Sequence, residues 1–196
     1  MPELVPPTVA PGTLAGLPQP TFPLGAGVEL RPWADGDARA VMSAYADPDI
    51  QRWHVRGIDS VDEAHEMISA WRQAWAQERR LEWAVAGIDG AVLGRLALKD
   101  LVLFDGIAEV AYWTVPAARG RGVAPRAVET LSRWAFEEVG LHRLELTHAT
   151  ANEASCRVAT KSGFPPEGTK RSATLHTDGW HDMHLHARIA GPAAMA

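Results

Sequence analysis

The stretch Tyr112-Trp113-Thr114-Val115-Pro116-Ala117-Ala118-Arg119-Gly120-Arg121-Gly122-Val123-Ala124 decides the fold. Its pattern predicts a strand that runs into a glycine-rich loop, and the loop opens a helix. Glycines let the backbone turn and approach a ligand closely. The N–H groups of a first helical turn have no intrahelical partners, and the helix dipole favours negative charge there. The stretch therefore predicts an anion-binding site.

The charges and spacing of this loop narrow the kind of anion site. Arg119 and Arg121 add positive charge, and Pro125 fits a first helical turn, where its missing N–H costs nothing. No Gly-Lys-Ser/Thr ends the loop, so it is not a Walker phosphate loop. The dinucleotide pattern G-x-G-x-x-G also fails, because Pro125 stands where its last glycine or alanine should be.

The elements expected around the loop define a mixed α/β fold. Ser60 and Glu63 form a capping-box pattern before an apolar helical stripe, and Asp89-Gly90 is typical of a tight hairpin turn. Asp35 or Asp37 is expected to begin an earlier helix, which Asp47-Pro48 ends. Strands are expected at 28–31, 82–88, 91–99, 107–115, 144–148, 164–172 and 180–189, and further helices at 123–139 and from Asn152 to Ser162-Gly163. This order predicts a mostly antiparallel sheet with one strand–helix–strand crossover.

Composition sets outer limits on the function. The chain has 196 residues, a net charge of −5 and a single cysteine, Cys156, so an internal disulfide is excluded and one domain is expected. The acidic balance argues against nucleic-acid binding. No apolar run is long enough to span a bilayer, and the first residues lack a signal-peptide pattern, so we expect a cytoplasmic protein without membrane contact. Residues 1–26 are expected to form a disordered or loosely packed arm, 27–190 the domain and 191–196 a tail.

Two motifs resemble those of a known family. Arg119-x-x-Gly122-x-Ala124 is similar to the Q/R-x-x-G-x-G/A signature of GNAT-superfamily N-acetyltransferases, which holds the pyrophosphate of acetyl-CoA. The segment 152–164 resembles the N-x-x-S-x-x-V/L-x-x-K-x-G-F pattern of the RimJ/RimL branch, which acetylates protein N-termini or small amines. The resemblance spans about 160 residues, from Val28 to Ile189. It implies the GNAT acyl-CoA N-acyltransferase fold, with helices on both faces of the sheet.

The resemblance also implies how acetyl-CoA binds. Strands 107–115 and 144–148 should be parallel neighbours that splay apart, and the pantetheine arm should lie in the gap against backbone N–H groups. The residues expected to bind acetyl-CoA are Val115, Arg119, Gly120, Arg121, Gly122, Val123, Ala124, Asn152 and Ser155. Asn152 is also a good helix cap, and both roles are compatible. No metal is expected.

The chemistry requires an amine without its proton and a protonated or hydrogen-bonded thiolate. Glu109 matches a catalytic glutamate of several family members and is the expected base, acting directly or through water; the alternative is a solvent-facing strand residue. The family's usual tyrosine acid is replaced by Ala159. Ser155, which matches a serine of RimL-like members, is therefore expected at the thiolate; the alternative is that it bonds only to the backbone.

Trp53 and His54 are expected, with Glu109, in the acceptor wall. His184 and His186 share a strand face, but a zinc site needs three or four converging ligands. Cys156 is expected to pack rather than react. The acceptor alternatives are a peptide N-terminus and a small amine such as an antibiotic. A non-catalytic acyl-CoA-binding module is the rival from another class, and the sequence leaves a homodimer open.

Overall fold

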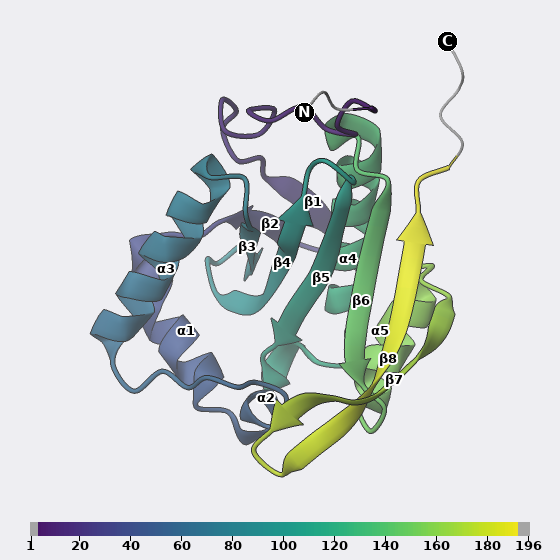
Figure 1. Ribbon diagram of the computed structural model, residues 1–196. Helices are drawn as coiled ribbons and strands as arrows, with labels where there is room; N and C mark the ends of the chain where they lie inside the picture. Colours follow the sequence, from purple (N-terminus) through teal and green to yellow (C-terminus); the bar gives the residue numbers. More distant parts are fainter. Residues whose placement is uncertain (1–3, 192–196) are drawn as a thin grey trace.

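The computed structural model describes residues 4–191 of the chain. It contains an eight-stranded sheet in the order β1-β2-β3-β4-β5-β6-β8-β7 (Figure 1). The strands are β1 (Phe22–Gly25), β2 (Val28–Pro32), β3 (Leu81–Gly87), β4 (Val92–Val102), β5 (Ile107–Thr114), β6 (Arg143–Ala149), β7 (Pro166–His176) and β8 (Gly179–Ile189). Among these residues β5 and β6 are the one parallel pair, and every other neighbouring pair is antiparallel. The expected mixed sheet is confirmed.

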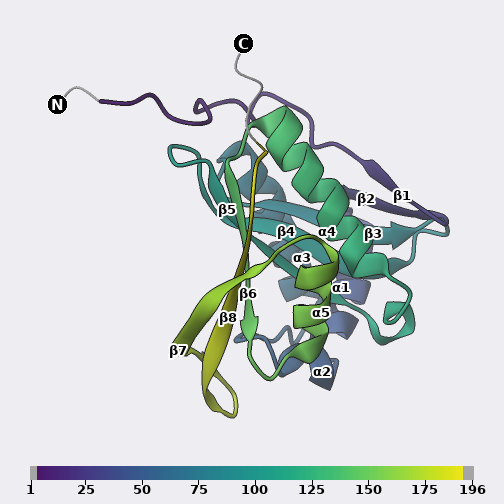
Figure 2. The same ribbon diagram turned by 90° about the vertical axis from the view of Figure 1, so that its right-hand side faces the viewer.

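Helices cover both faces of this sheet. They are α1 (Ala38–Tyr45), α2 (Pro48–Gln51), α3 (Val61–Ala76), α4 (Val123–Trp134) and α5 (Glu153–Lys161). The helices α4 and α5 lie together on one face, and α1 and α3 on the other (Figures 1 and 2). Neighbouring side chains of one strand accordingly enter different cores: Trp83 packs with the α4 cluster, and Ala84 packs with the α1–α3 cluster.

Local signals explain where most helices begin and end. The Ser60 hydroxyl accepts the Glu63 N–H at 3.2 Å and begins α3, as the capping pattern predicted. The expected helix 123–139 is regular only to Trp134 and continues as a π-helical turn, Ala135–Val139, before Gly140 ends it in a left-handed conformation. Asp47 ends no helix directly: α1 stops at Tyr45, and the Asp47 side chain caps the short α2 instead.

The N-terminal segment differs from the expected loose arm. Val9 and Leu14 are 3% and 1% exposed, and Phe22–Gly25 forms β1 against β2. Pro- and Gly-rich sequence prevents regular structure here, yet apolar side chains and backbone groups still find partners in the domain. Parts of this segment are thus packed against the domain, whereas Leu4, Val5 and Leu17 are 97%, 58% and 56% exposed. Residues 1–3 and, apart from Gly191, the expected tail lie outside the described residues.

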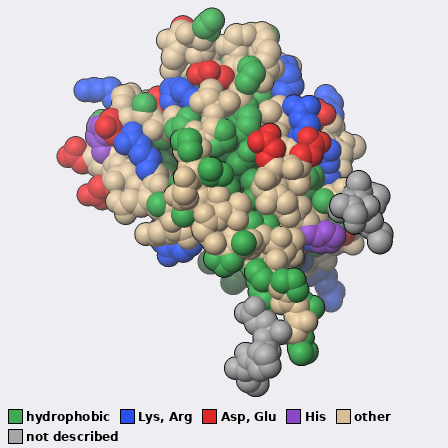
Figure 3. Space-filling model, turned by 90° about the horizontal axis from the view of Figure 1, so that it is seen from above, with side chains coloured by type: hydrophobic (Ala, Val, Ile, Leu, Met, Phe, Trp, Pro, Cys, Tyr) green, Lys and Arg blue, Asp and Glu red, His purple; other side chains and the backbone are tan. Residues whose placement is uncertain are grey.

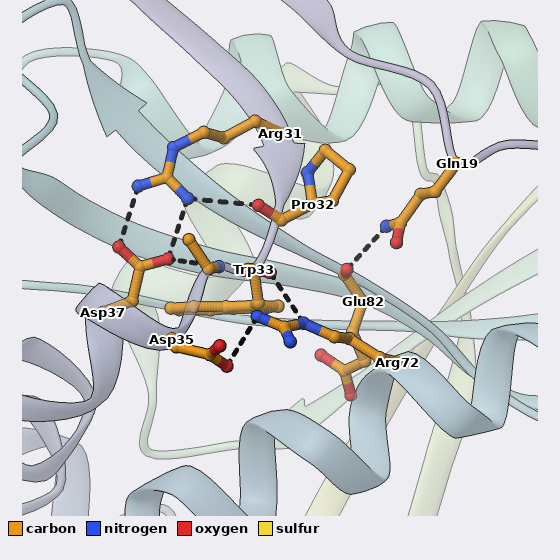
Figure 4. Close-up of polar contacts among 9 residues, drawn as sticks. Gln19, Arg31, Pro32, Trp33, Asp35, Asp37, Arg72 and Glu82 are labelled. Carbon is orange, nitrogen blue, oxygen red and sulfur yellow. Dashed lines mark hydrogen bonds and ion pairs between the residues drawn. The ribbon is translucent and has the colours of Figure 1, made fainter.

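Side chains of the domain fix this segment in place. The Glu78 carboxylate accepts the N–H groups of Gly12 and Leu14, both at 2.6 Å. The Trp83 indole donates to the Pro20 carbonyl at 2.8 Å, and the Gln19 amide donates to the Glu82 carbonyl (Figure 4). These bonds satisfy backbone groups of a segment that has little secondary structure of its own.

Two ion pairs connect interior strands of the sheet with each other and with the start of α1. Arg31 forms a bidentate pair with Asp37 at 2.7 and 2.8 Å, which holds the entry to α1 (Figure 4). Arg95 and Glu82 form a second bidentate pair, at 2.6 and 2.7 Å, and their side chains are 3% and 1% exposed. This buried pair lies between the sheet and α3, where the Arg95 guanidinium also stacks on the Trp71 ring.

The face of the molecule that lies at the top of Figure 1 carries apolar side chains near its centre, with charged groups of both signs around them (Figure 3). Within the described residues, no helix has the length and apolar character needed to cross a bilayer.

Candidate active site

The strands β5 and β6 separate soon after they meet. They pair only where Ile107, Ala108 and Glu109 lie beside residues 143–145. Beyond that point β6 continues its pairing with β8 alone, and β5 continues with β4 alone. The rest of β5 therefore has a free backbone edge, as the resemblance implied for a splayed pair.

The hydrogen-bond pattern of β5 shows which N–H groups face the gap. The Val115 N–H donates to the Leu93 carbonyl at 3.0 Å, so it points toward β4. Alternate residues of a strand direct their backbone groups to opposite sides. The N–H groups of Tyr112 and Thr114 consequently face the gap, and they are the donors available to a ligand there. The Val110 N–H points to β6 where the two strands still pair, beside Glu109 and Glu145, and the Val115 N–H points to β4.

Side chains of β5 alternate between the two faces of the sheet in the same way. Val110 packs into the α4 core and Trp113 into the α1–α3 core. Tyr112 therefore projects toward α4 and α5, whereas Glu109 projects toward α1 and α3. The two polar side chains stand on opposite sides of the gap.

The glycine-rich loop joins β5 to α4 on the α4 side of the gap. Gly120 and Gly122 have φ of 73° and 70°, left-handed values that favour glycine, and Gly122 is the residue before the first turn of α4. The first-turn N–H groups of α4 lack intrahelical partners and carry the positive end of the dipole. The strand, loop and helix have the arrangement that the sequence predicted, and anion binding by the loop stays a prediction.

Arg119 takes a different position from the one its charge suggested. Its guanidinium bonds to Asp47 at 2.8 Å and to Asp49 at 2.6 Å, and its Nε donates to the Thr114 carbonyl at 3.1 Å. The side chain thus fastens the loop to α2. The exposed Arg121 is the loop cation that stays outside this ion-pair network.

Two cavities meet at the gap. One, of about 580 Å³, is bordered by the loop, α2 and α5; the other, of about 950 Å³, extends toward α3 and the β7–β8 hairpin. Five residues line both cavities: Trp53, His54, Tyr112, Asn152 and Ser155. A ligand in one cavity can therefore meet a ligand in the other at these side chains. Four of the five were expected from the sequence; Tyr112 was not.

Glu109 lines the larger cavity beside Lys99. The carboxylate is 3.1 Å from Lys99 Nζ, and its side chain is 24% exposed. Burial raises the pKa of Glu109 above its usual value, and Lys99 offsets only part of that rise. A carboxylate with a raised pKa is a stronger base, so the position suits proton removal from an amine. The carboxylate faces this cavity, and its role as the base stays a prediction.

Ser155 pairs with a tyrosine that the sequence analysis did not single out. Its hydroxyl lies 2.6 Å from the Tyr112 hydroxyl, and its N–H donates to the Asn152 side chain at 3.0 Å. Burial raises the pKa of Tyr112 to about 12, so the phenol keeps its proton at neutral pH. Ala159 is a fully buried residue of α5. A buried phenol therefore lies beside Ser155, and it comes from β5, whereas position 159 is on α5.

Trp53 and His54 form an aromatic wall between the cavities. His54 packs edge-on against Tyr45, and burial lowers the pKa of His54 to about 4, so its ring is neutral at pH 7. Trp53 contacts His176 and His181 edge-on, with ring centroids 5.9 and 6.0 Å away. The wall therefore links α2 to the β7–β8 hairpin.

Comparison with known proteins settles the family. The sequence model of the family described as the acetyltransferase (GNAT) domain matches residues 28–165. The chain belongs to the GNAT acetyltransferase family. It is an acetyl-CoA-dependent N-acetyltransferase with RimJ/RimL-like character, as the two motifs predicted.

Individual relatives agree with this assignment. The chain is 24% identical over 162 residues to the uncharacterized N-acetyltransferase YoaA of Bacillus subtilis, covering 82% of this chain and 92% of YoaA. It is 24% identical over 160 residues to the L-amino acid N-acetyltransferase AaaT of Escherichia coli, covering 78% and 92%. The structure of Mycobacterium smegmatis RimJ in complex with CoA-disulfide superposes with a TM-score of 0.81 at 26% identity, covering 91% of each chain.

Proposed function

We propose that this GNAT enzyme transfers the acetyl group of acetyl-CoA to the α-amino group of a peptide N-terminus, by direct attack in a ternary complex. One observation carries the proposal. The two cavities join at the splayed strands, with Glu109 on the α3 side of the gap and the Tyr112–Ser155 pair on the α5 side. The amine and the thioester can then approach from opposite faces of the sheet.

The smaller cavity is the proposed site of acetyl-CoA. Its pyrophosphate would bind the loop from Gly120 to Ala124 through backbone N–H groups, with Arg121 adding charge. The pantetheine arm would follow the free edge of β5, where the N–H groups of Tyr112 and Thr114 face it. One of these donors would bond to the thioester carbonyl and stabilise the oxyanion that forms there. Arg119 would act indirectly, because it holds the loop against α2.

The larger cavity is the proposed site of the amine. Glu109 accepts a proton from the ammonium group, directly or through water, and the free amine attacks the thioester carbonyl carbon. The tetrahedral intermediate then collapses, the C–S bond breaks, and the thiolate leaves. Ser155 donates a proton to the thiolate and recovers one from Tyr112, whose hydroxyl is in hydrogen-bond contact.

A peptide α-amine is the acceptor that several observations favour. The segment 152–164 resembles a branch that acetylates protein N-termini or small amines, and AaaT is named for an α-amine acceptor. The cavity of about 950 Å³ has room for several residues of a peptide. Neutral His54 and Trp53 give the amine an uncharged aromatic wall that does not repel it.

A thiol-release assay tests the proposal. Acetyl-CoA is combined with a panel of short peptides, free amino acids and aminoglycosides, and mass spectrometry locates the acetyl group. We expect release with peptides and acetylation of their α-amine. Release with aminoglycosides or other non-peptide amines alone would replace the peptide with a small amine. Acetyl-CoA that raises the melting temperature without release from any amine would favour the binding-module alternative.

A single substitution tests the role of Glu109. Glu109→Gln should lower kcat/KM by about 10²- to 10⁴-fold, the usual contribution of a general base. Glu66→Gln is the matched control, because Glu66 lines the same cavity from exposed positions on α3. Equal effects of the two substitutions would exclude Glu109 as the base.

A further inference from the structure

Three histidines and the single cysteine converge beside the active-site cleft. They come from three elements: His148 from β6, Cys156 from α5, and His184 and His186 from β8. One nitrogen or sulfur atom of each lies within 4.8 Å of the corresponding atoms of the others. We refer to these four residues as the His₃Cys cluster.

The strand register creates this cluster. His148 stands directly opposite His184, and Leu146 stands opposite His186 in the antiparallel β6–β8 pair. Leu146 and His148 share one strand face, so the three histidines line the same side of the sheet. That side is covered by α5, whose residue Cys156 follows Ser155 directly.

The distances fit a tetrahedral metal. Zinc binds histidine nitrogen at about 2.0–2.1 Å, so two nitrogens of a tetrahedral site are about 3.3–3.4 Å apart. Nε2 of His148 and Nε2 of His186 lie 3.2 Å apart. The other separations, all within 4.8 Å, need only small side-chain rotations to reach that geometry.

The outer nitrogens of the same two rings fix their tautomers. His148 Nδ1 lies 2.8 Å from the Ala149 carbonyl, and His186 Nδ1 lies 3.0 Å from the Phe164 carbonyl. A carbonyl only accepts, so each Nδ1 carries a proton and each Nε2 presents a lone pair. Histidine metal ligands commonly donate their second N–H to a backbone carbonyl in this way.

Without a cation the two lone pairs face each other at 3.2 Å and repel. Both rings are buried, with 4% and 2% of their surface exposed, and the cluster contains no carboxylate. A metal cation that binds both nitrogens and the Cys156 thiolate would remove this repulsion and give each lone pair a partner.

We propose that the His₃Cys cluster binds one zinc ion, which fastens α5 to β6 and β8. Imidazole and thiolate ligands favour zinc over magnesium or calcium, which prefer oxygen. Four protein ligands fill a tetrahedral shell, so the ion is structural and does not activate water. Because α5 carries Asn152 and Ser155, the ion holds the N-terminal end of α5 in its place at the gap.

The sequence analysis predicted no metal site here. His184 and His186 were recognised as sharing a face, and Cys156 as the only thiol, but two histidines alone do not make a zinc site. His148 lies 36 positions before His184, and no spacing motif relates them. The antiparallel pairing of β6 with β8 supplies the third histidine.

Metal analysis of the purified full-length protein, with any affinity tag removed, tests the site. We expect about one zinc per chain by mass spectrometry of the element. After chelation, added Zn²⁺ should raise the melting temperature. Co²⁺ should give tetrahedral visible bands and a thiolate-to-metal charge-transfer band. Protein that contains no zinc and shows no shift in melting temperature with Zn²⁺ or Co²⁺ would overturn the proposal.

Two ligand variants and a control make the assignment specific. Cys156→Ser should remove the charge-transfer band, and His184→Ala should weaken zinc binding by at least about 10²-fold, beyond the effect of losing an outer partner. His65→Ala is the control, because His65 is exposed on α3. Circular dichroism checks that each variant is folded. A cobalt spectrum unchanged by Cys156→Ser, or equal zinc affinity in the His184 and His65 variants, would place the metal elsewhere and refute the site.

Discussion

Replacing Tyr112 with Phe removes one hydroxyl group from the boundary between the two cavities. That hydroxyl lies 2.6 Å from the Ser155 hydroxyl, and the phenol has a pKa of about 12 because it is buried. It is therefore protonated at neutral pH and can resupply the proton that Ser155 gives to the thiolate. The loss of one hydrogen bond costs about 1 kcal/mol of stability, too little to unfold the protein.

The kinetic effect should be larger than the effect on stability. Proton transfer by a positioned group contributes about 10²-fold or more, equivalent to about 2.7 kcal/mol of barrier. Tyr112→Phe and Ser155→Ala should each lower kcat by about 10²-fold with little change in the KM for acetyl-CoA. Because the two hydroxyls act as one relay, the double variant should also lose about 10²-fold, not 10⁴-fold.

Steady-state thiol release at saturating acetyl-CoA measures these values. Ser162→Ala is the control, since Ser162 lies at the other end of α5 and its hydroxyl donates to the Pro125 carbonyl at 3.3 Å. It should reduce stability but leave kcat unchanged. Multiplicative losses in the double variant would show that the two hydroxyls act independently. Unchanged kcat in Tyr112→Phe would remove Tyr112 from the relay.

Three further predictions concern the base, the loop and the N-terminal segment. Lys99 lowers the pKa of Glu109, so Lys99→Met should move the acidic limb of the kcat/KM–pH profile to higher pH; a shift to lower pH would exclude Glu109 as its source. Gly122→Ala and Gly140→Ala each force alanine into a left-handed conformation and should each cost about 1–2 kcal/mol of stability, but only Gly122→Ala should raise the KM for acetyl-CoA; equal KM values would contradict the loop's role. Partial burial raises the pKa of Glu78, but three backbone N–H groups outweigh it and lower the pKa overall, so its contribution is present above the ordinary glutamate pKa and is lost as pH falls through the lowered value. Glu78→Gln should therefore reduce the unfolding free energy by about 1 kcal/mol at pH 7, and the difference should vanish in acid; a difference independent of pH would disprove this sign.

Local sequence determined the elements that carry the chemistry. The loop from Arg119 to Ala124, the Asn152 cap of α5 and the Ser60 cap of α3 are each specified by residues a few positions apart. Such signals are readable because backbone conformation and capping depend on near neighbours in the chain. They were sufficient to indicate the family, the acetyl donor and most residues of the gap.

Tertiary structure decided which distant residues meet. Tyr112 and Ser155 are 43 positions apart, and their contact depends on where α5 packs against β5. The sequence predicts that Arg119 binds phosphate, but in the folded protein its guanidinium pairs with Asp47 and Asp49. The apolar residues of the N-terminal segment lack periodicity, so only the burial of Val9, Leu14 and Leu24 shows that parts of the segment pack against the domain.

The histidines show the same division most clearly. The sequence by itself established two histidines on one face of β8, because strand alternation is a local rule. The third histidine and the cysteine joined them only through the pairing of β6 with β8 and the placement of α5. Backbone geometry is determined by short stretches of sequence. The convergence of side chains, in contrast, depends on register and packing between elements that are far apart in the chain.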